Sequence, residues 1–219
     1  MTKKEKVAFY RKKLGELYGE APCTLEYKDA FHLVVAAQLA AQCTDARVNM
    51  VTPALFARFP NAQAFAEAEI GELEELIRST GFYHNKAKNL KKCGQVLCAE
   101  FGGSVPDNME DLLRLPGVGR KIANLVLGDV FGKPAVVVDT HCKRITYLLG
   151  LTKNTDPTKI EKDLVKILPP EYSSLFCHQM VEHGRNLCIA RRPRCGECPL
   201  APMCDFAIKG LKQAKKERT

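Results

Sequence analysis

Apolar residues recur at helical spacing along most of this chain. Residues 31–42 are rich in alanine and apolar on all sides, which predicts a buried helix. Three further segments place apolar residues three or four positions apart, with charged or polar residues between them. These apolar positions are Ile70, Leu73, Leu76 and Ile77, then Leu90, Cys93, Val96 and Leu97, and finally Ile160, Leu164, Ile167 and Leu168. The pattern predicts an all-α fold.

Only residues 136–138, three consecutive valines, have the β-branched character of a strand, and no partner strand is evident. This argues against an α/β sheet. Asp139 follows the valines and is predicted to cap a helix that runs towards Leu149. The same carboxylate would also suit the edge of a site where a positive charge or a transferred proton needs a partner. The two roles are compatible, because a capping carboxylate keeps a spare oxygen.

A glycine turn joins two predicted helices at residues 115–121, Leu-Pro-Gly-Val-Gly-Arg-Lys. Pro116 cannot continue the first helix, and the glycines on either side of Val118 let the backbone turn sharply. The second helix would point its bare N-terminal amides outward, which makes an anion site. Arg120 and Lys121 lie beside that site, so a nucleic-acid phosphate is the expected anion. An ordinary helix–turn–helix corner with a basic surface is the alternative, since a lone Gly-x-Gly is a weak signal.

Four cysteines near the C-terminus have the spacing of metal ligands, with six, two and five residues between them. They are Cys188, Cys195, Cys198 and Cys204. Zinc and an iron–sulfur cluster both accept four thiolates, and the chemistry of the ligands alone does not separate them. Paired disulfides are disfavoured, because the chain has 10 cysteines and no secretory signal. The other six cysteines lack ligand spacing and are expected to be small buried apolar residues.

Charge and composition add a modest constraint. The chain has 219 residues, a net charge of +8 and a pI near 9.0, which suits a polyanionic partner. No stretch is apolar for long enough to cross a membrane. The tail at residues 209–219 is basic and poor in apolar residues, so we expect it to fray or to be disordered.

The hairpin with its lysine, the Val-Asp-Thr-His segment at residues 138–141 and the cysteine spacing, in this order, resemble the endonuclease III family. These proteins are base-excision DNA glycosylases and AP lyases of the helix-hairpin-helix superfamily. Further matches are Leu-Ala-Ala-Gln-Cys-Thr-Asp at residues 39–45, Gly-Phe-Tyr-His-Asn-Lys-Ala at residues 81–87, and His-Gly-Arg at residues 183–185. The resemblance covers about residues 25–206, nearly the whole chain.

The resemblance implies a two-lobed fold with DNA bound between the lobes. A six-helix domain would span residues 24–133 and include the hairpin. A second domain would combine residues 1–23 with residues 134–219, and its loop at residues 188–204 would hold a four-iron four-sulfur cluster. The expected partner is damaged double-stranded DNA, bound by a monomer in the prokaryotic cytoplasm at the nucleoid.

The resemblance also assigns chemistry to individual residues. Lys121 would attack C1′ of the sugar, displace an oxidised pyrimidine and, through a Schiff base, permit β-elimination of the 3′ phosphate. Because only the neutral amine attacks, we expect burial and neighbouring positive charge around it. Asp139 would stabilise cationic character at the sugar and assist proton transfer.

Base extrusion and DNA contacts are assigned in the same way. Gln42 matches the position that fills the hole left by the extruded base. Phe82 lies where the family often has a leucine wedge. The expected contacts with the DNA backbone are Gly117, Val118, Gly119 and Arg120 of the hairpin, and Arg191 and Arg192 of the metal loop.

Three alternatives stay open. A non-catalytic DNA clamp would need the cations of the hairpin but not Asp139. Adenine-specific relatives lack the hairpin lysine and carry a long additional C-terminal domain, whereas this chain has Lys121 and stops soon after Cys204. A zinc-dependent regulator would hold zinc rather than iron and sulfide.

Overall fold

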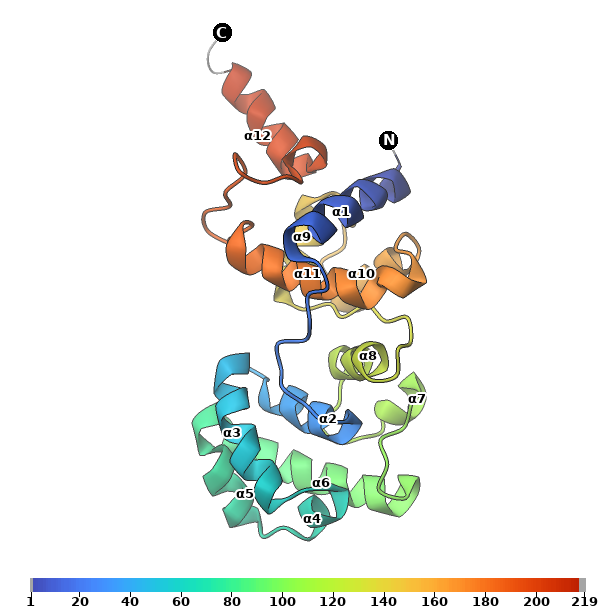
Figure 1. Ribbon diagram of the computed structural model, residues 1–219, viewed down its shortest axis with the longest axis vertical. Coiled ribbons are helices and arrows are strands. Elements are labelled where there is room, and N and C mark those ends of the chain that lie inside the picture. Colours follow the sequence, from blue (N-terminus) through green and yellow to red (C-terminus); the bar gives the residue numbers. More distant parts are fainter. Residues whose placement is uncertain (1, 217–219) are drawn as a thin grey trace. The chain divides into compact units, whose positions relative to one another are not determined.

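The computed structural model describes residues 2–216, and the side chains up to residue 210. Throughout this part of the chain the regular secondary structure is helical, with no strand, which confirms the all-α prediction (Figure 1). Contacts divide the chain into two compact units. One is formed by Met1–Pro22 with Pro134–Thr219, and the other is Cys23–Lys133. None of the described helices combines the length and apolar character that a membrane crossing requires.

The unit Cys23–Lys133 holds the hairpin. Its elements in chain order are α2 (Ala30–Leu39), α3 (Asp45–Arg58), α4 (Ala62–Glu67), α5 (Ile70–Ile77), the 3-10 turn η1 (Arg78–Thr80), α6 (Tyr83–Phe101), α7 (Met109–Leu112) and α8 (Arg120–Asp129). Helix α2 is buried on nearly all sides, as its apolar sequence predicts, but it ends at Leu39 rather than Gln42. Asp29 caps its start by accepting a hydrogen bond from the His32 amide at 2.9 Å.

Helices α4 and α6 approach each other closely because α6 has a glycine at the contact. A Cβ on Gly94 would lie 2.6 Å from the Ala62 carbonyl oxygen and 2.8 Å from the Ala66 nitrogen. No side chain fits between these backbones, so only glycine allows this packing distance. The core of the unit is completed by aromatic residues such as Phe59 and Phe65, both fully buried.

The second unit is built around α9 and α11. Its elements are α1 (Lys3–Tyr18), α9 (Thr140–Leu148), α10 (Pro157–Val165), the 3-10 turn η2 (Pro170–Tyr172), α11 (Ser173–Asn186), the 3-10 turn η3 (Ala201–Met203) and α12 (Asp205–Lys216). A Cβ on Gly184 of α11 would lie 2.0 Å from Nδ1 of His141 on α9, so the glycine makes room for the histidine ring. Tyr10 of α1 is fully buried and its hydroxyl donates to the Met203 carbonyl at 2.7 Å.

The three valines at residues 136–138 form an extended segment without a partner strand. The Ala135 amide donates to Ser173 Oγ at 3.2 Å, and the Val137 amide donates to Cys177 Sγ at 3.2 Å. Side chains of α11 therefore accept hydrogen bonds that the carbonyls of a neighbouring strand would accept in a sheet, and they hold the segment against this helix.

The prediction that the tail frays from residue 209 was wrong as far as Lys216, because α12 continues to that residue. Residues 212–216 consist entirely of lysine, glutamine and alanine, which all have high helix propensity, and this outweighs the scarcity of apolar residues. Residues 217–219 lie outside the part of the chain that the structure describes.

Candidate active site and metal centre

The hairpin turn has the geometry of an anion site. Gly117 has a φ of 80°, and the Val118 amide donates to the Leu115 carbonyl at 3.0 Å, which closes the turn. Gly119 is the N-cap of α8 and offers no side chain to the helix end. The first hydrogen bond of the helix runs from the Ala123 amide to the Gly119 carbonyl, so the amides before Ala123 have no partner within α8. They lie at the positive end of the helix dipole.

The predicted contact residues of the hairpin differ in what they expose. Gly117, Gly119 and Arg120 are exposed. The side chain of Val118 is only 6% exposed, and its amide is already bonded within the turn. Val118 therefore anchors the turn to the core, and in this geometry neither its side chain nor its amide is available to DNA.

Lys121 lies in the first turn of α8, one residue after Arg120, and is exposed. The expectation that the protein buries this amine was wrong. The hairpin reverses the chain immediately before the lysine, so its side chain extends from a helix end rather than from a packed helix face. The amine is accessible to a substrate that contacts the amides of the helix end.

Gln42 and Phe82 share an uncommon backbone conformation. Their φ angles are 54° and 50°, and within residues 2–216 they are the only residues other than glycine with positive φ. Phe82 is 63% exposed, and Gln42 is exposed as well. A left-handed conformation is disfavoured for residues with a Cβ, and it is tolerated where the surroundings hold it in place. Two strained, exposed side chains in the unit that also holds the hairpin fit a site that inserts residues into a ligand.

Asp139 caps α9, as predicted. Its Oδ1 accepts from the Cys142 amide at 2.6 Å, and the side chain is half-buried. No further hydrogen bond or ion pair of this carboxylate is found among the described residues, so Oδ2 is available. Lys121 and Asp139 belong to different units of the chain.

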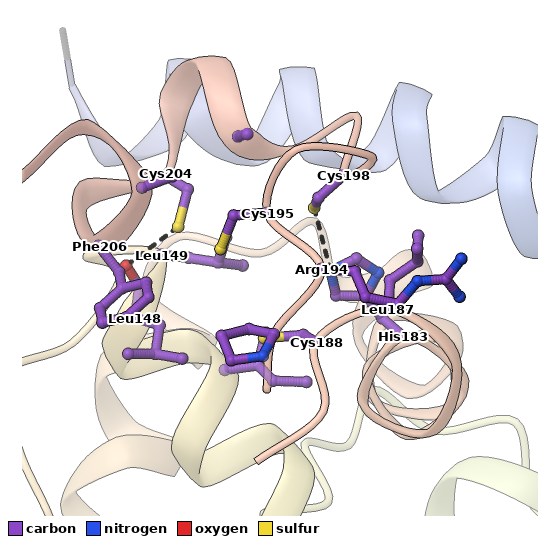
Figure 2. Close-up of a pocket in the computed structure, with 14 residues that line it drawn as sticks. Leu148, Leu149, His183, Leu187, Cys188, Arg194, Cys195, Cys198, Cys204 and Phe206 are labelled. Atoms are coloured by element: carbon purple, nitrogen blue, oxygen red, sulfur yellow. Dashed lines mark hydrogen bonds between the residues drawn. The ribbon is translucent and has the colours of Figure 1, made fainter. Parts of the chain in front are cut away.

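The four predicted ligand cysteines surround one pocket in the loop between α11 and α12. Figure 2 shows their sulfur atoms gathered around this one pocket. Apolar residues complete the wall, including Ile145, Leu148, Leu149, Leu187 and Phe206. Among the described residues, no three His, Cys, Asp or Glu side chains converge closely enough to hold one metal ion. Four thiolates around one pocket are also the ligand set that a four-iron four-sulfur cluster takes.

The ionisation of these thiols also fits a metal cluster. Burial raises the pKa of the Cys198 and Cys204 thiols, and the charge of Cys188 raises each of them further. Four thiolates in one small apolar space repel each other unless a cationic group neutralises them. The pocket thus has the donor set, the apolar lining and the charge requirement of an iron–sulfur site.

A second layer of polar residues holds the ligands. Arg144 of α9 donates to the Cys188 sulfur at 3.5 Å and to the Cys188 carbonyl at 2.5 Å. His183 Nε2 lies 3.6 Å from the Cys198 sulfur, and the Tyr18 hydroxyl lies 3.0 Å from His183 Nδ1. Such donors orient the ligands and adjust the electron density on sulfur.

The protonation of His183 follows from its surroundings. Burial, with help from the positive charge of Arg144, lowers the pKa of His183 to about 4, so the ring is neutral. Burial raises the pKa of Tyr18 to about 12, so its hydroxyl keeps a proton. A metal-bound Cys198 thiolate can only accept, so Nε2–H would donate to it, and Nδ1 of the neutral ring would then accept from the Tyr18 hydroxyl. Arg144, Tyr18 and this role of His183 were not predicted from the sequence, although His183 lies in a segment that matches the family.

The basic residues of the metal loop are not equivalent. Arg194 forms an ion pair with Glu197 and donates to the Asn186 carbonyl at 3.4 Å. Arg191 and Arg192 are exposed, and neither pairs with any side chain in the described part of the chain. Two of the three arginines are therefore available to phosphates.

Comparisons with known proteins identify the same segments. Residues 35–170 match the model of the HhH-GPD superfamily base excision DNA repair protein, and residues 188–204 match the iron-sulfur binding domain of endonuclease III. The chain is 53% identical to endonuclease III of Synechocystis sp. over 196 residues, which is 89% of each protein. It is 40% identical to endonuclease III of Bacillus subtilis over 217 residues, or 99% of this chain and 98% of that protein.

Solved structures agree with this assignment. A trapped endonuclease III-DNA covalent intermediate superposes with a TM-score of 0.90 at 38% sequence identity, and covers 96% of this chain and 100% of that one. A non-covalent endonuclease III-DNA complex gives the same score and identity over 97% of this chain. A thermostable thymine-DNA glycosylase, at 20% identity and a TM-score of 0.85, shares the fold.

Proposed function

The chain belongs to the endonuclease III family of helix-hairpin-helix base-excision repair proteins, and on that premise we propose that Lys121 and Asp139 carry its chemistry. Membership makes it a DNA-binding DNA glycosylase and AP lyase with a four-iron four-sulfur cluster. The observation that carries the proposal is an exposed primary amine in the first turn of the helix that the hairpin leads into. A trapped covalent DNA intermediate of a relative supports a nucleophilic route.

The proposed reaction begins with base removal. The lone pair of the Lys121 amine attacks C1′ of the damaged nucleotide, and the bond from C1′ to the base breaks with its electrons leaving on the base, which takes up a proton. Positive charge develops at the sugar in this step. The free oxygen of Asp139 would stabilise that charge and accept a proton from the attacking amine. The bond from C1′ to the ring oxygen O4′ then breaks, O4′ takes up the proton held by Asp139, and an imine forms between Lys121 and C1′.

Strand cleavage follows from the imine. The imine acidifies the C2′ hydrogen, and loss of that proton expels the 3′ phosphate by β-elimination. Water then hydrolyses the imine and releases Lys121. Lys121 is the only residue that forms a covalent bond to the DNA in this scheme, so one amine serves both the glycosylase and the lyase steps.

Other residues bind and open the duplex. The amides of the α8 N-terminus and Arg120 would hold phosphates, with Gly117 and Gly119 allowing close approach and Val118 fixing the turn. Arg191 and Arg192 would hold phosphates from the metal loop. Gln42 and Phe82 would enter the base stack as the lesion leaves it.

The substrate proposed is duplex DNA with an oxidised pyrimidine such as thymine glycol. A ring-saturated base stacks poorly, so its extrusion costs less than that of a normal base. We assign the hairpin lobe to residues 24–133 and the cluster lobe to residues 1–23 with 134–219. A monomer acting at the nucleoid in the prokaryotic cytoplasm suits this substrate.

Borohydride trapping on abasic DNA tests the proposal. Lys121→Gln should abolish both trapping and strand cleavage while it still binds abasic DNA. Asp139→Asn should keep binding and slow turnover by about 2–4 kcal/mol, the usual loss for an electrostatic stabiliser of a transition state. Arg120→Gln is the matched control, because it removes the neighbouring cation and should weaken binding but leave trapping intact at saturating DNA. A trapped adduct with Lys121→Gln would place the nucleophile elsewhere.

A further inference from the structure

Lys86 is a buried cation without an acidic partner. It lies in the first turn of α6 and is only 6% exposed. No carboxylate pairs with it among the described residues. Its ammonium donates instead to two backbone carbonyls, of Leu39 at 2.8 Å and of Thr80 at 2.9 Å. Burial lowers the pKa of Lys86, which reflects the cost of keeping a charge away from water.

Both acceptors are the last residues of helical segments. Leu39 ends α2 and Thr80 ends the turn η1. The carbonyls at such ends lack partners within their own helix and lie at its negative pole, so a cation there is well bound. One ammonium therefore joins the C-terminal ends of two helical segments, and the last residues of these segments lie 41 positions apart in the sequence.

The residues that follow these two ends are the candidate wedges. Gln42 comes three residues after Leu39, and Phe82 comes two residues after Thr80. Both have the left-handed backbone described above. The amide of Lys86 also donates to the Phe82 carbonyl at 3.1 Å, so both the backbone and the side chain of Lys86 hold the Phe82 segment.

We propose that Lys86 is a positioning residue that keeps Gln42 and Phe82 at a fixed separation, so that the two side chains enter the base stack together. This inference rests on the wedge role proposed for Gln42 and Phe82. A direct link between their backbones limits how far two strained loops can move relative to each other, and the hydrogen bonds of Lys86 provide that link. Lys86 itself is buried and does not touch DNA.

The test compares Lys86→Met, which keeps the length of the side chain and removes its donors, with Lys88→Met as the matched control. Lys88 lies in the same helix and is exposed. Extrusion is followed by stopped-flow fluorescence of 2-aminopurine placed next to a thymine glycol in duplex DNA. Lys86→Met should slow extrusion about tenfold or more, since it removes two charge-assisted hydrogen bonds, and Lys88→Met should not.

A second substrate separates positioning from general stability. Trapping on a single-stranded abasic oligonucleotide needs no extrusion, so Lys86→Met should trap it at the wild-type rate. Lys86→Arg, which keeps donors for both carbonyls, should recover part of the extrusion rate. The inference would be overturned if Lys86→Met lowered the extrusion rate on duplex DNA and the trapping rate on single-stranded DNA by the same factor. It would also be overturned if extrusion by the arginine variant were as slow as extrusion by the methionine variant.

A third variant separates this inference from the wedge proposal. If Gln42→Ala with Phe82→Ala does not slow extrusion, the wedge role itself fails. If that pair slows extrusion and Lys86→Met does not, only the positioning role fails. If Lys86 acts through the wedges, adding Lys86→Met to the alanine pair should slow extrusion no further. A further tenfold reduction in that background would assign Lys86 another role.

Discussion

Gly117→Ala should destabilise the protein and displace the hairpin, whereas Gly119→Ala should do neither. A Cβ on Gly117 would lie 2.2 Å from Gln38 Oε1 and 3.2 Å from Asn89 Cβ, and the residue has a φ of 80°. A Cβ on Gly119 would meet no atom within 4 Å, and its φ of −96° suits any residue. The two glycines of the same turn thus make a matched pair.

The cost of the Gly117 change has two parts. A left-handed residue with a Cβ costs roughly 1–2 kcal/mol. Crowding adds about 1 kcal/mol, which is the low end of the usual cost of overpacking, because the Gln38 oxygen is the far end of a flexible side chain. That side chain is nevertheless only 4% exposed, and Asn89 Cβ cannot rotate away. Alanine restricts the unfolded chain and returns about 0.4–1 kcal/mol. The net destabilisation is about 2 kcal/mol.

Urea denaturation followed by far-ultraviolet circular dichroism measures the difference. Gly119→Ala should change the free energy of unfolding by less than about 0.5 kcal/mol, because the entropic gain offsets a weaker N-cap. In fluorescence anisotropy, Gly117→Ala should also weaken binding to abasic DNA, since the turn must shift. Combining it with Gln38→Ala should recover the crowding part alone. Equal stabilities of the two glycine variants would refute this account of the hairpin.

Two predictions concern the metal loop. Purified protein should be brown and contain iron and acid-labile sulfide, and stoichiometric zinc instead of iron would contradict this. Replacing any cluster cysteine with alanine should remove the cluster and DNA binding, whereas Cys93→Ala or Cys98→Ala should not. Replacing Arg191 and Arg192 with alanine should reduce the log–log salt slope of binding to undamaged duplex by about 0.9 for each phosphate that is no longer neutralised, while Arg194→Ala, whose charge Glu197 already offsets, should change it less.

Local sequence signals predicted the elements that depend on neighbouring residues. The cap at Asp139, the turn at Gly117 and the spacing of the cluster cysteines can each be recognised within one short stretch of the chain. The cap was confirmed by its bond to the Cys142 amide, and the four cysteines do line one pocket. Short-range patterns succeed here because the physical cause, a helix end or a loop that holds a metal, is itself short-range.

Contacts between distant segments could not be predicted in this way. The Lys86 ammonium bonds to a carbonyl 47 residues earlier, and Arg144 bonds to a cysteine 44 residues later. A lysine in a polar-looking helix start normally indicates a solvated position, so nothing in the sequence marks Lys86 as buried. The positive φ angles of Gln42 and Phe82 could not be predicted from the sequence either, because neither residue type favours that conformation.

The last turn of α2 contacts or leads into three proposed functional elements, which are the hairpin, Lys86 and Gln42. Gln38 packs beneath Gly117 of the hairpin, Leu39 accepts from Lys86, and Gln42 follows three residues later. All of these residues, together with Lys121, lie in the unit Cys23–Lys133, whereas Asp139 lies in the other unit. In the proposed assignment, the phosphate contacts of the hairpin, base extrusion and nucleophilic attack all depend on the unit Cys23–Lys133, whereas the assisting carboxylate and the two free arginines of the metal loop belong to the other. Asp139→Asn, which keeps an oxygen to cap α9, should therefore lower the chemical rate alone, whereas a disturbed α2 turn should impair binding and extrusion as well.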